Sequence, residues 1–202
     1  MVMSDPSRRA PDLAHGRRPI AVVVCGAPGS GKSTVGALIA HGLSAALLDL
    51  DTATASLTAV ISSLHGTRDL DDPELATLTR AARYEAITCL AVDNLAAGVS
   101  AVLVAPFTSE RREPGAWERL ERRMVDAGGK AEMVWLQISA DDVVRRVEKR
   151  GAERDRAKLH REWTAGLDLD APAVPHLAVD ALLSPPVIAD TVLASVTQEQ
   201  WR

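Results

Sequence analysis

A nine-residue segment near the amino end has the residue types and spacing of a phosphate-binding loop. It reads Gly26-Ala27-Pro28-Gly29-Ser30-Gly31-Lys32-Ser33-Thr34 and fits the pattern G-x-x-x-x-G-K-[ST] at every defined position. Backbone N–H groups in such a glycine-rich turn can converge on a polyphosphate without side chains in the way. Lys32 would reach the β- and γ-phosphates, and the Ser33 hydroxyl would ligate Mg²⁺. The loop therefore predicts binding of a nucleoside triphosphate, ATP or GTP, together with Mg²⁺.

The segments on either side of this loop support that interpretation. Residues 20–25 form an unbroken apolar run of strand length, as expected for a parallel strand buried on both faces. After the loop, apolar residues recur at helical spacing through Leu43, so a helix would add its unpaired amides and the positive end of its dipole. The alternative is a glycine turn with a surface lysine. The complete motif between a strand and a helix favours the phosphate site.

Two aspartates follow the second predicted strand, residues 45–48. Strand alternation predicts that Asp49 and Asp51 point to the same side, at the carboxyl edge where ligands bind in doubly wound sheets. One carboxylate could hold Mg²⁺, directly or through water, and the other could accept the proton of an attacking hydroxyl. The alternative is that the pair caps a helix that begins near Thr54. The place at the strand edge favours the catalytic interpretation.

Four arginines further along the chain are candidates for contacts with an anionic substrate. Arg80 and Arg83, on a helix predicted from about residue 74 to 97, could grip an anionic acceptor or be solvated. Arg111 and Arg112 follow an apolar strand predicted at residues 100–105 and could contact phosphate or acceptor, or lie on the surface. Both alternatives stay open for each pair. That strand ends in Ala105 and lacks the aspartate found there in many P-loop enzymes, so Ser33 and the aspartate pair must carry metal binding.

A dense run of basic side chains follows the fourth predicted strand. A charge run is usually a solvated helix face, but the place after this strand favours a mobile lid over about residues 145–165. Arg150 and Arg154 lie four apart, on one face if the helix continues, and would offset charge on the transferring phosphoryl group.

The remaining elements are predicted from apolar periodicity and turn residues. The loop after the fifth strand is where such folds often hold adenine. The expected elements are a short helix at 57–64, a helix at 113–127, a strand at 132–138, a helix at 140–149 capped by Ser139, a strand at 176–180 and a helix at 187–196.

Composition limits the classes of partner. The chain has 202 residues, 47% of them hydrophobic, which suits one α/β domain over residues 19–202 behind a flexible tail at 1–18. A net charge of -4 and 3% aromatic residues do not favour a nucleic-acid partner. No apolar stretch is long enough to span a membrane, and the amino end lacks a secretory core. Cys25 and Cys89 lie in apolar segments, which indicates buried thiols in the cytoplasm.

Taken together, the phosphate loop, the aspartate pair and the segments 80–84, 105–107 and 150–159 resemble those of a known family. The chain is similar to small P-loop "predicted kinase" ATPases, AAA-type ATP-binding proteins related to polynucleotide 5′-hydroxyl kinase domains and to shikimate, gluconate and adenylylsulfate kinases. The resemblance implies a three-layer α/β/α fold with a five-stranded parallel sheet in 2-3-1-4-5 order and a helical lid. It also implies Asp51 as the base, Asp49 near the metal, and Arg150 and Arg154 as lid arginines.

The expected activity is transfer of the γ-phosphoryl group of Mg-ATP to a hydroxyl of a small molecule. Members of this family accept different substrates, so the resemblance does not name the acceptor. Two alternatives are a kinase for the 5′-hydroxyl ends of polynucleotides and a nucleotide-binding regulatory ATPase without an acceptor.

Overall fold

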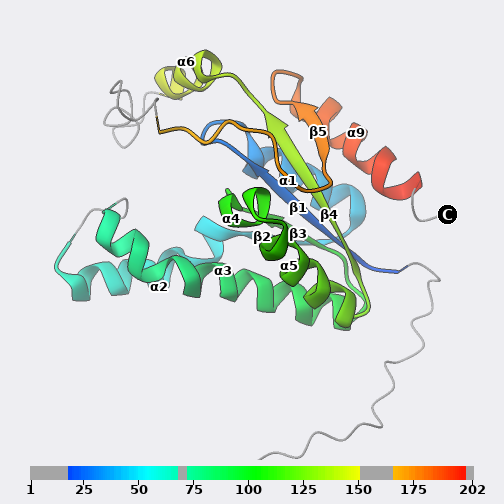
Figure 1. Ribbon diagram of the computed structural model, residues 1–202, viewed down its shortest axis with the longest axis horizontal. Coiled ribbons are helices and arrows are strands. Elements are labelled where there is room, and N and C mark those ends of the chain that lie inside the picture. Colours follow the sequence, from blue (N-terminus) through cyan, green and yellow to red (C-terminus); the bar gives the residue numbers. More distant parts are fainter. Residues whose placement is uncertain (1–17, 68–71, 151–165, 199–202) are drawn as a thin grey trace, which may run out of the picture.

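The computed structural model describes residues 18–67, 72–150 and 166–198. Helices and strands alternate along the chain around one central sheet (Figure 1). The elements are β1 (Ile20–Gly26), α1 (Lys32–Leu43), β2 (Ala46–Asp49), α2 (Leu50–His65), α3 (Pro73–Ala96), β3 (Ala101–Val104), α4 (Thr108–Arg112), α5 (Pro114–Asp126), β4 (Lys130–Gln137), α6 (Ala140–Arg150), β5 (Leu177–Asp180) and α9 (Pro185–Gln198).

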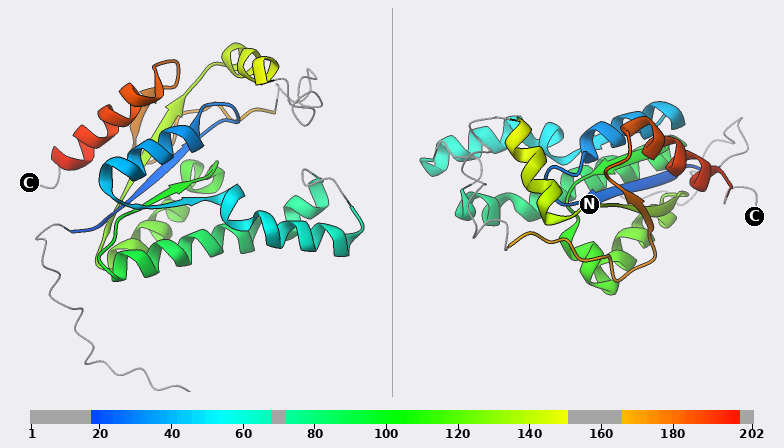
Figure 2. Two further views of the ribbon diagram at one scale, coloured as in Figure 1. Left: turned by 180° about the vertical axis from the view of Figure 1, so that it is seen from behind. Right: turned by 90° about the horizontal axis from the view of Figure 1, so that it is seen from above.

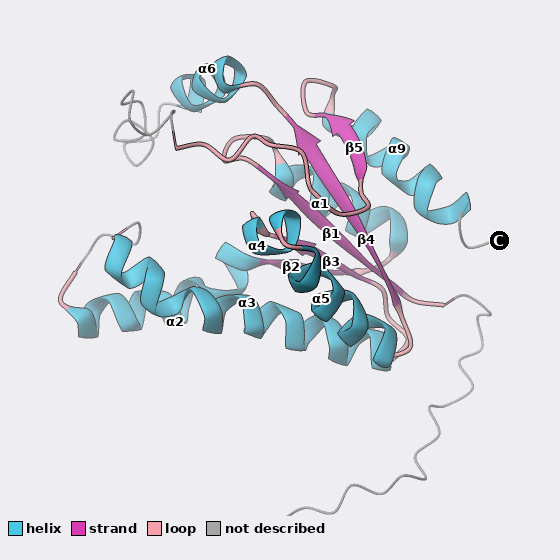
Figure 3. Cartoon of the chain, in the orientation of Figure 1, coloured by secondary structure: helices cyan, strands magenta, loops and turns pink. Residues whose placement is uncertain are grey.

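The sheet has five parallel strands in the order β2-β3-β1-β4-β5, which confirms the predicted topology. β1 lies in the middle, and every one of its residues is buried, as its unbroken apolar sequence requires. Two apolar clusters fill the space above and below the sheet. One involves α1 and α9 and the other α3 and α5, so the fold has three layers (Figures 2 and 3).

The packing of α1 against the sheet depends on a glycine. A Cβ atom at Gly36 would lie 2.4 Å from Cγ2 of Val104 and would clash with it, because the valine side chain has little rotamer freedom to move away. We expect Gly36→Ala to lower the free energy of unfolding by about 1–2 kcal/mol, because overpacking outweighs the better helix propensity of alanine. Chemical denaturation measures this change. Gly115→Ala on α5 is the matched control, because its Cβ would meet only the mobile end of Arg119 at 3.6 Å. A similar decrease in the free energy of unfolding for Gly115→Ala would contradict the packing argument.

Several sequence predictions need correction at the level of single elements. α2 begins at Leu50, far earlier than the predicted helix at 57–64, because the Asp49 carboxylate accepts hydrogen bonds from the N–H groups of Asp51 and Thr52 and caps the helix. Asp51 therefore lies in a helical turn, and the predicted strand alternation of the two aspartates is wrong. Cys89 is exposed on α3, whereas Cys25 is buried as predicted.

The cap predicted for α6 is confirmed, since the Asp142 N–H donates to the Ser139 hydroxyl at 3.2 Å. A short extra helix, α4, precedes the helix predicted at 113–127. Across the described ranges, no helix combines the length and the apolar character that crossing a membrane requires.

Candidate active site

The loop between β1 and α1 has the backbone conformation of an anion cradle. Gly26 and Gly31 have φ angles of +144° and +94°, which side chains other than hydrogen rarely allow. At Gly26 a Cβ would also lie 2.9 Å from the carbonyl oxygen of Leu136 on β4. Gly31 is the N-cap of α1, and no side chain caps this end, so the first amides of the helix are left to a ligand.

Lys32 bends back over this loop. Its ammonium group donates to the carbonyl oxygen of Ala27 at 2.8 Å. The side chain is half-buried, and this desolvation lowers the pKa of Lys32 to about 8, although the charges of Asp51 and Asp49 act in the opposite direction. A polyphosphate in the loop would place negative charge next to the Lys32 ammonium group.

Ser33 and Asp49 bring two oxygen donors together at the end of β2. The Ser33 hydroxyl donates to one carboxylate oxygen of Asp49 at 2.7 Å, while the other oxygen caps α2. A hydroxyl and a carboxylate suit Mg²⁺, which binds oxygen ligands and keeps several waters. The described residues hold no group of three or more His, Cys, Asp or Glu for a metal. Mg²⁺ at this place would therefore draw its other ligands from water and phosphate.

Asp51 pairs with Arg83, one of the predicted acceptor contacts. The Arg83 guanidinium donates to the Asp51 carboxylate at 2.6 Å and to the Thr54 hydroxyl at 2.8 Å. These contacts fix the Asp51 side chain from α3, which the sequence did not indicate because the two residues are 32 apart. Arg83 is partly buried and paired with Asp51, so a contact between Arg83 and an acceptor stays a prediction. Arg80 is exposed and lies over the Tyr84 ring, 5.5 Å from its centroid.

Arg111 is buried, so its surface alternative is wrong. It is 2% exposed, and it donates to the Asp168 carboxylate and, at 3.2 Å, to the carbonyl oxygen of Asp170. Arg112 is exposed and also contacts Asp168, at 2.9 Å. The two arginines thus tie α4 to the segment that leads to β5. A contact between Arg111 and the acceptor stays a prediction.

The sequence did not predict a role for Arg146, which belongs to the basic run after the fourth strand. From α6 it donates to the carbonyl oxygens of Gly29 at 3.2 Å and Ser30 at 3.1 Å, and it also contacts the carbonyl oxygen of Ala181 after β5. Arg146 therefore holds the outer side of the loop against the last strand. No local pattern marks this role, because the partners are backbone atoms more than 30 residues away.

A cavity of about 390 Å³ lies beside the loop, where adenine was expected. It is lined by the loop, by α6 and by the segment after β5, including Ala181, Leu183 and Pro185. The side chain of Arg150, all of Arg154 and most of the predicted lid lie outside the described residues, so the roles expected of them stay predictions.

The strand order, the glycine loop and the helix that starts from it define a P-loop fold. The chain belongs to the AAA domain family, whose profile matches residues 22–166. A search of curated proteins found no match.

Three solved structures with the same fold are kinases by their titles. A putative kinase from Chloroflexus aurantiacus J-10-fl shares 21% identity at a TM-score of 0.65, over 92% of this chain and 99% of that one. An APS kinase from Mycobacterium tuberculosis, solved with AMPPNP and APS, shares 21% identity at a TM-score of 0.63, over 90% of this chain and 99% of that one. A gluconokinase from Sinorhizobium meliloti 1021 shares 21% identity at a TM-score of 0.56, over 91% of this chain and 95% of that one. At these identities the likeness shows a shared fold.

Proposed function

We propose that this protein is a kinase that transfers the γ-phosphoryl group of Mg-ATP to a hydroxyl group of a small molecule. The observation that carries the proposal is the continuous line of contacts from the loop to Asp51. Ser33 contacts Asp49, and Asp49 accepts from the N–H of Asp51. A carboxylate that Arg83 orients therefore stands next to the place where the phosphates and Mg²⁺ would bind.

Each part of the site has a role in this reaction. The loop amides and Lys32 bind the triphosphate, and the cavity beside the loop receives the adenine ring. Ser33 and Asp49 would hold Mg²⁺, which would neutralise phosphate charge when bound. Asp51 orients the acceptor hydroxyl and accepts its proton, which suits a transfer that depends mainly on positioning and electrostatics. Arg150 and Arg154 offset charge on the transferring group. The acceptor lies near Asp51, with Arg80, Arg83 and Arg111 as its predicted contacts.

The test is the rate of ADP release from Mg-ATP across a panel of acceptors. We expect one class of sugars, nucleosides or aminoglycoside-like compounds to raise the rate above slow hydrolysis. Acceleration by a 5′-hydroxyl oligonucleotide, with binding that weakens steeply with salt, would establish the polynucleotide kinase instead. ATP binding with slow hydrolysis and no response to any acceptor would establish the regulatory ATPase.

The pKa of Lys32 predicts how nucleotide affinity depends on pH. Only the protonated ammonium attracts phosphate, and in the free protein it loses its proton near pH 8. Affinity for Mg-ATP should therefore fall as pH rises, by on the order of tenfold between pH 7.5 and pH 9. Isothermal titration calorimetry in buffers of different ionisation enthalpy should show proton uptake on binding in this range.

Lys32→Arg is the matched control for this prediction. A guanidinium stays protonated throughout the range, so whatever affinity the variant keeps should be nearly constant from pH 7.5 to pH 9. An affinity of the wild-type protein that is equally constant would contradict a titrating Lys32 at the phosphates.

A further inference from the structure

The helix α2 presents a line of apolar side chains to solvent. Ala53, Leu57, Val60 and Leu64 are all exposed, and the last three have exposed fractions of 70%, 58% and 84%. They follow one another at intervals of four, three and four residues, the spacing that places side chains along the seam between two packed helices. We call these four residues the α2 seam. The described residues leave it uncovered, although it has the form of a helix–helix contact.

The pairing of α2 with α3 determines which way the seam faces. Thr54 contacts Arg83, and His65 at the end of α2 contacts Glu74 at the start of α3, so the two helices are antiparallel. The pair extends past the end of the sheet (Figure 1). One turn from the contact between Thr54 and Arg83, both helices carry a buried threonine, Thr58 on α2 and Thr79 on α3. These two threonines mark the sides on which the helices meet.

The exposed leucines face away from the predicted acceptor site. Leu57 directly precedes Thr58, and Leu78, which is 63% exposed, directly precedes Thr79. Residues in such corresponding positions lie on the same side of an antiparallel pair. Arg80 follows Thr79 and, at about 100° per residue, lies on the opposite side of α3. An acceptor that contacts Arg80 therefore does not cover the leucines.

The side that carries the leucines lacks charge on α2. No Asp, Glu, Lys or Arg occurs between Asp51 and His65. A solvated helix face is commonly charged, whereas the core of a protein–protein interface is depleted of charged residues. The seam and Leu78 together expose roughly 500 Å² of apolar surface, a size at which exposed patches often serve an interaction. The composition of α2 thus favours a partner that is itself apolar and uncharged.

The α2 seam complements itself when a second copy of the helix runs in the opposite direction. Ala53 then meets Leu64 of the second copy, and Leu57 meets Val60, so each layer pairs a larger side chain with a smaller one. A parallel arrangement would pair alanine with alanine and would leave a gap at that end. A contact with two-fold symmetry requires a surface that complements itself in this way. The same helix of a second chain therefore meets the requirement.

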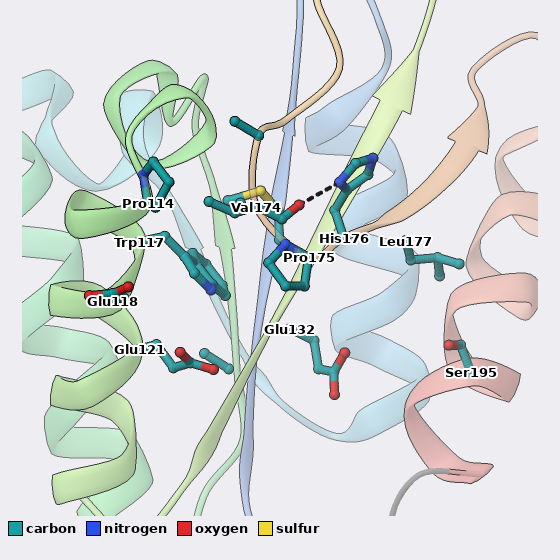
Figure 4. A pocket seen from close by; sticks show the side chains of 13 residues that line it. Pro114, Trp117, Glu118, Glu121, Glu132, Val174, Pro175, His176, Leu177 and Ser195 are labelled. Carbon is teal, nitrogen blue, oxygen red and sulfur yellow. Dashed lines mark hydrogen bonds between the residues drawn. The ribbon is translucent and has the colours of Figure 1, made fainter.

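The groove beside β4 is a poorer match for the seam. Its volume is about 660 Å³, and Figure 4 shows Glu118 and Glu121 on one wall, with Glu132 between this wall and the other. Apolar side chains that covered these carboxylates would remove their hydration. Insertion of one copy's seam into the groove of another would also be a head-to-tail contact, which produces rings or open chains.

We propose that two copies of this chain associate through the α2 seam, packed antiparallel against the same seam of the other copy. The α2 and α3 helices of both copies then form a four-helix bundle, and Leu78 borders the contact. The side of α3 that carries Arg80 stays open, so both sites of the dimer remain accessible. The apolar area lies below the roughly 800 Å² per partner of a standard interface, so the dimer should dissociate in the micromolar range.

Sedimentation velocity of the full-length protein tests the proposal. We expect the wild-type chain to change from monomer to dimer between about 1 and 200 µM. Leu57→Glu/Leu64→Glu should raise the dissociation constant at least about a hundredfold, because carboxylates enter an apolar contact. Val125→Glu/Val187→Glu is the matched control, since it places the same charges at exposed apolar positions on α5 and α9. The dissociation constant of this control should stay within about threefold of the wild-type value.

Disulfide formation tests the direction of the two helices. All chains carry Cys89→Ser, which removes the exposed native thiol. An oxidised mixture of Ala53→Cys and Leu64→Cys chains, above the dissociation constant, should give a cross-linked dimer. Neither chain alone should do so, because in an antiparallel pair the two copies of each residue lie about 16 Å apart along the helix axis.

A chain that stays monomeric up to about 200 µM would overturn the proposal, as would a dimer that Leu57→Glu/Leu64→Glu leaves intact. Cross-linking of Ala53→Cys or Leu64→Cys chains alone, without cross-linking of the mixture, would overturn the antiparallel contact. Larger oligomers that change with Glu118→Gln/Glu121→Gln would assign the seam to the groove of Figure 4 and would also overturn it. All variants should keep the wild-type circular dichroism spectrum, because the substituted residues are exposed.

Discussion

Asp51→Asn is expected to lower the turnover number about 10²- to 10⁴-fold while leaving the affinity for Mg-ATP nearly unchanged. Asparagine has the same shape, and its carbonyl oxygen can still accept the hydrogen bond that Arg83 donates to Asp51. The variant therefore removes the negative charge and the proton acceptor without releasing the side chain. Steady-state kinetics with the best acceptor from the panel, together with calorimetry for the nucleotide, separate the two effects.

Asp49→Asn provides the comparison for this experiment. Asparagine caps a helix as well as aspartate does, so α2 should keep its stability. We expect this variant to need more Mg²⁺ for half-maximal activity, because it loses the charge beside Ser33. An Asp51→Asn enzyme with full turnover would remove Asp51 from the role of base, and the same change in Mg²⁺ requirement for both variants would place both aspartates at the metal.

The parts of the site that the sequence predicted are those encoded within one short segment. The phosphate loop needs glycine at Gly26 and Gly31 for its backbone angles, and this requirement leaves a direct trace in the sequence. The strand order was implied by the resemblance to the kinase family alone. Contacts such as Arg83 with Asp51, or Arg146 with the loop carbonyls, join distant elements, so no local pattern encodes them.

The helix α2 shows how an apolar pattern can mislead. A short helix was predicted over residues 57–64, yet the leucines at its two ends, Leu57 and Leu64, are 70% and 84% exposed. The buried face consists of Leu50 and, after it, of Thr54, Thr58 and Ser62. The Thr54 hydroxyl donates to the carbonyl oxygen of Leu50. Small polar residues can pack closely against a neighbouring helix when their hydroxyl groups bond to their own backbone. Periodicity locates a helix but does not decide which of its faces is buried.

Arg111→Met is expected to lower the free energy of unfolding by about 3 kcal/mol. The guanidinium is buried, and its loss leaves the partly buried Asp168 carboxylate with the exposed Arg112 as its remaining cationic partner. For a chain of this size, such a loss corresponds to a decrease in melting temperature of roughly 6–12 °C. Thermal unfolding monitored by circular dichroism measures it.

Arg112→Met is the matched control, since it removes the same charge from the same carboxylate at an exposed place. Arg112→Met should lower the free energy of unfolding by no more than about 1 kcal/mol. Equal losses for both variants would show that burial of Arg111 contributes nothing to the pair.

The dependence of this difference on pH follows from Asp168. Partial burial raises the pKa of Asp168, but the hydrogen bonds and charges of Arg112 and Arg111 outweigh it and hold the pKa below its usual value. A carboxyl group whose pKa is lowered in the folded state contributes stability above its unfolded pKa of about 3.9 and loses it as pH falls through the folded value. The difference between the wild-type protein and Arg111→Met should therefore be full at pH 7 and should shrink as pH falls below about 4. A difference that stays constant down to pH 3 would show that lost packing of the Arg111 side chain, rather than its charge, causes the destabilisation.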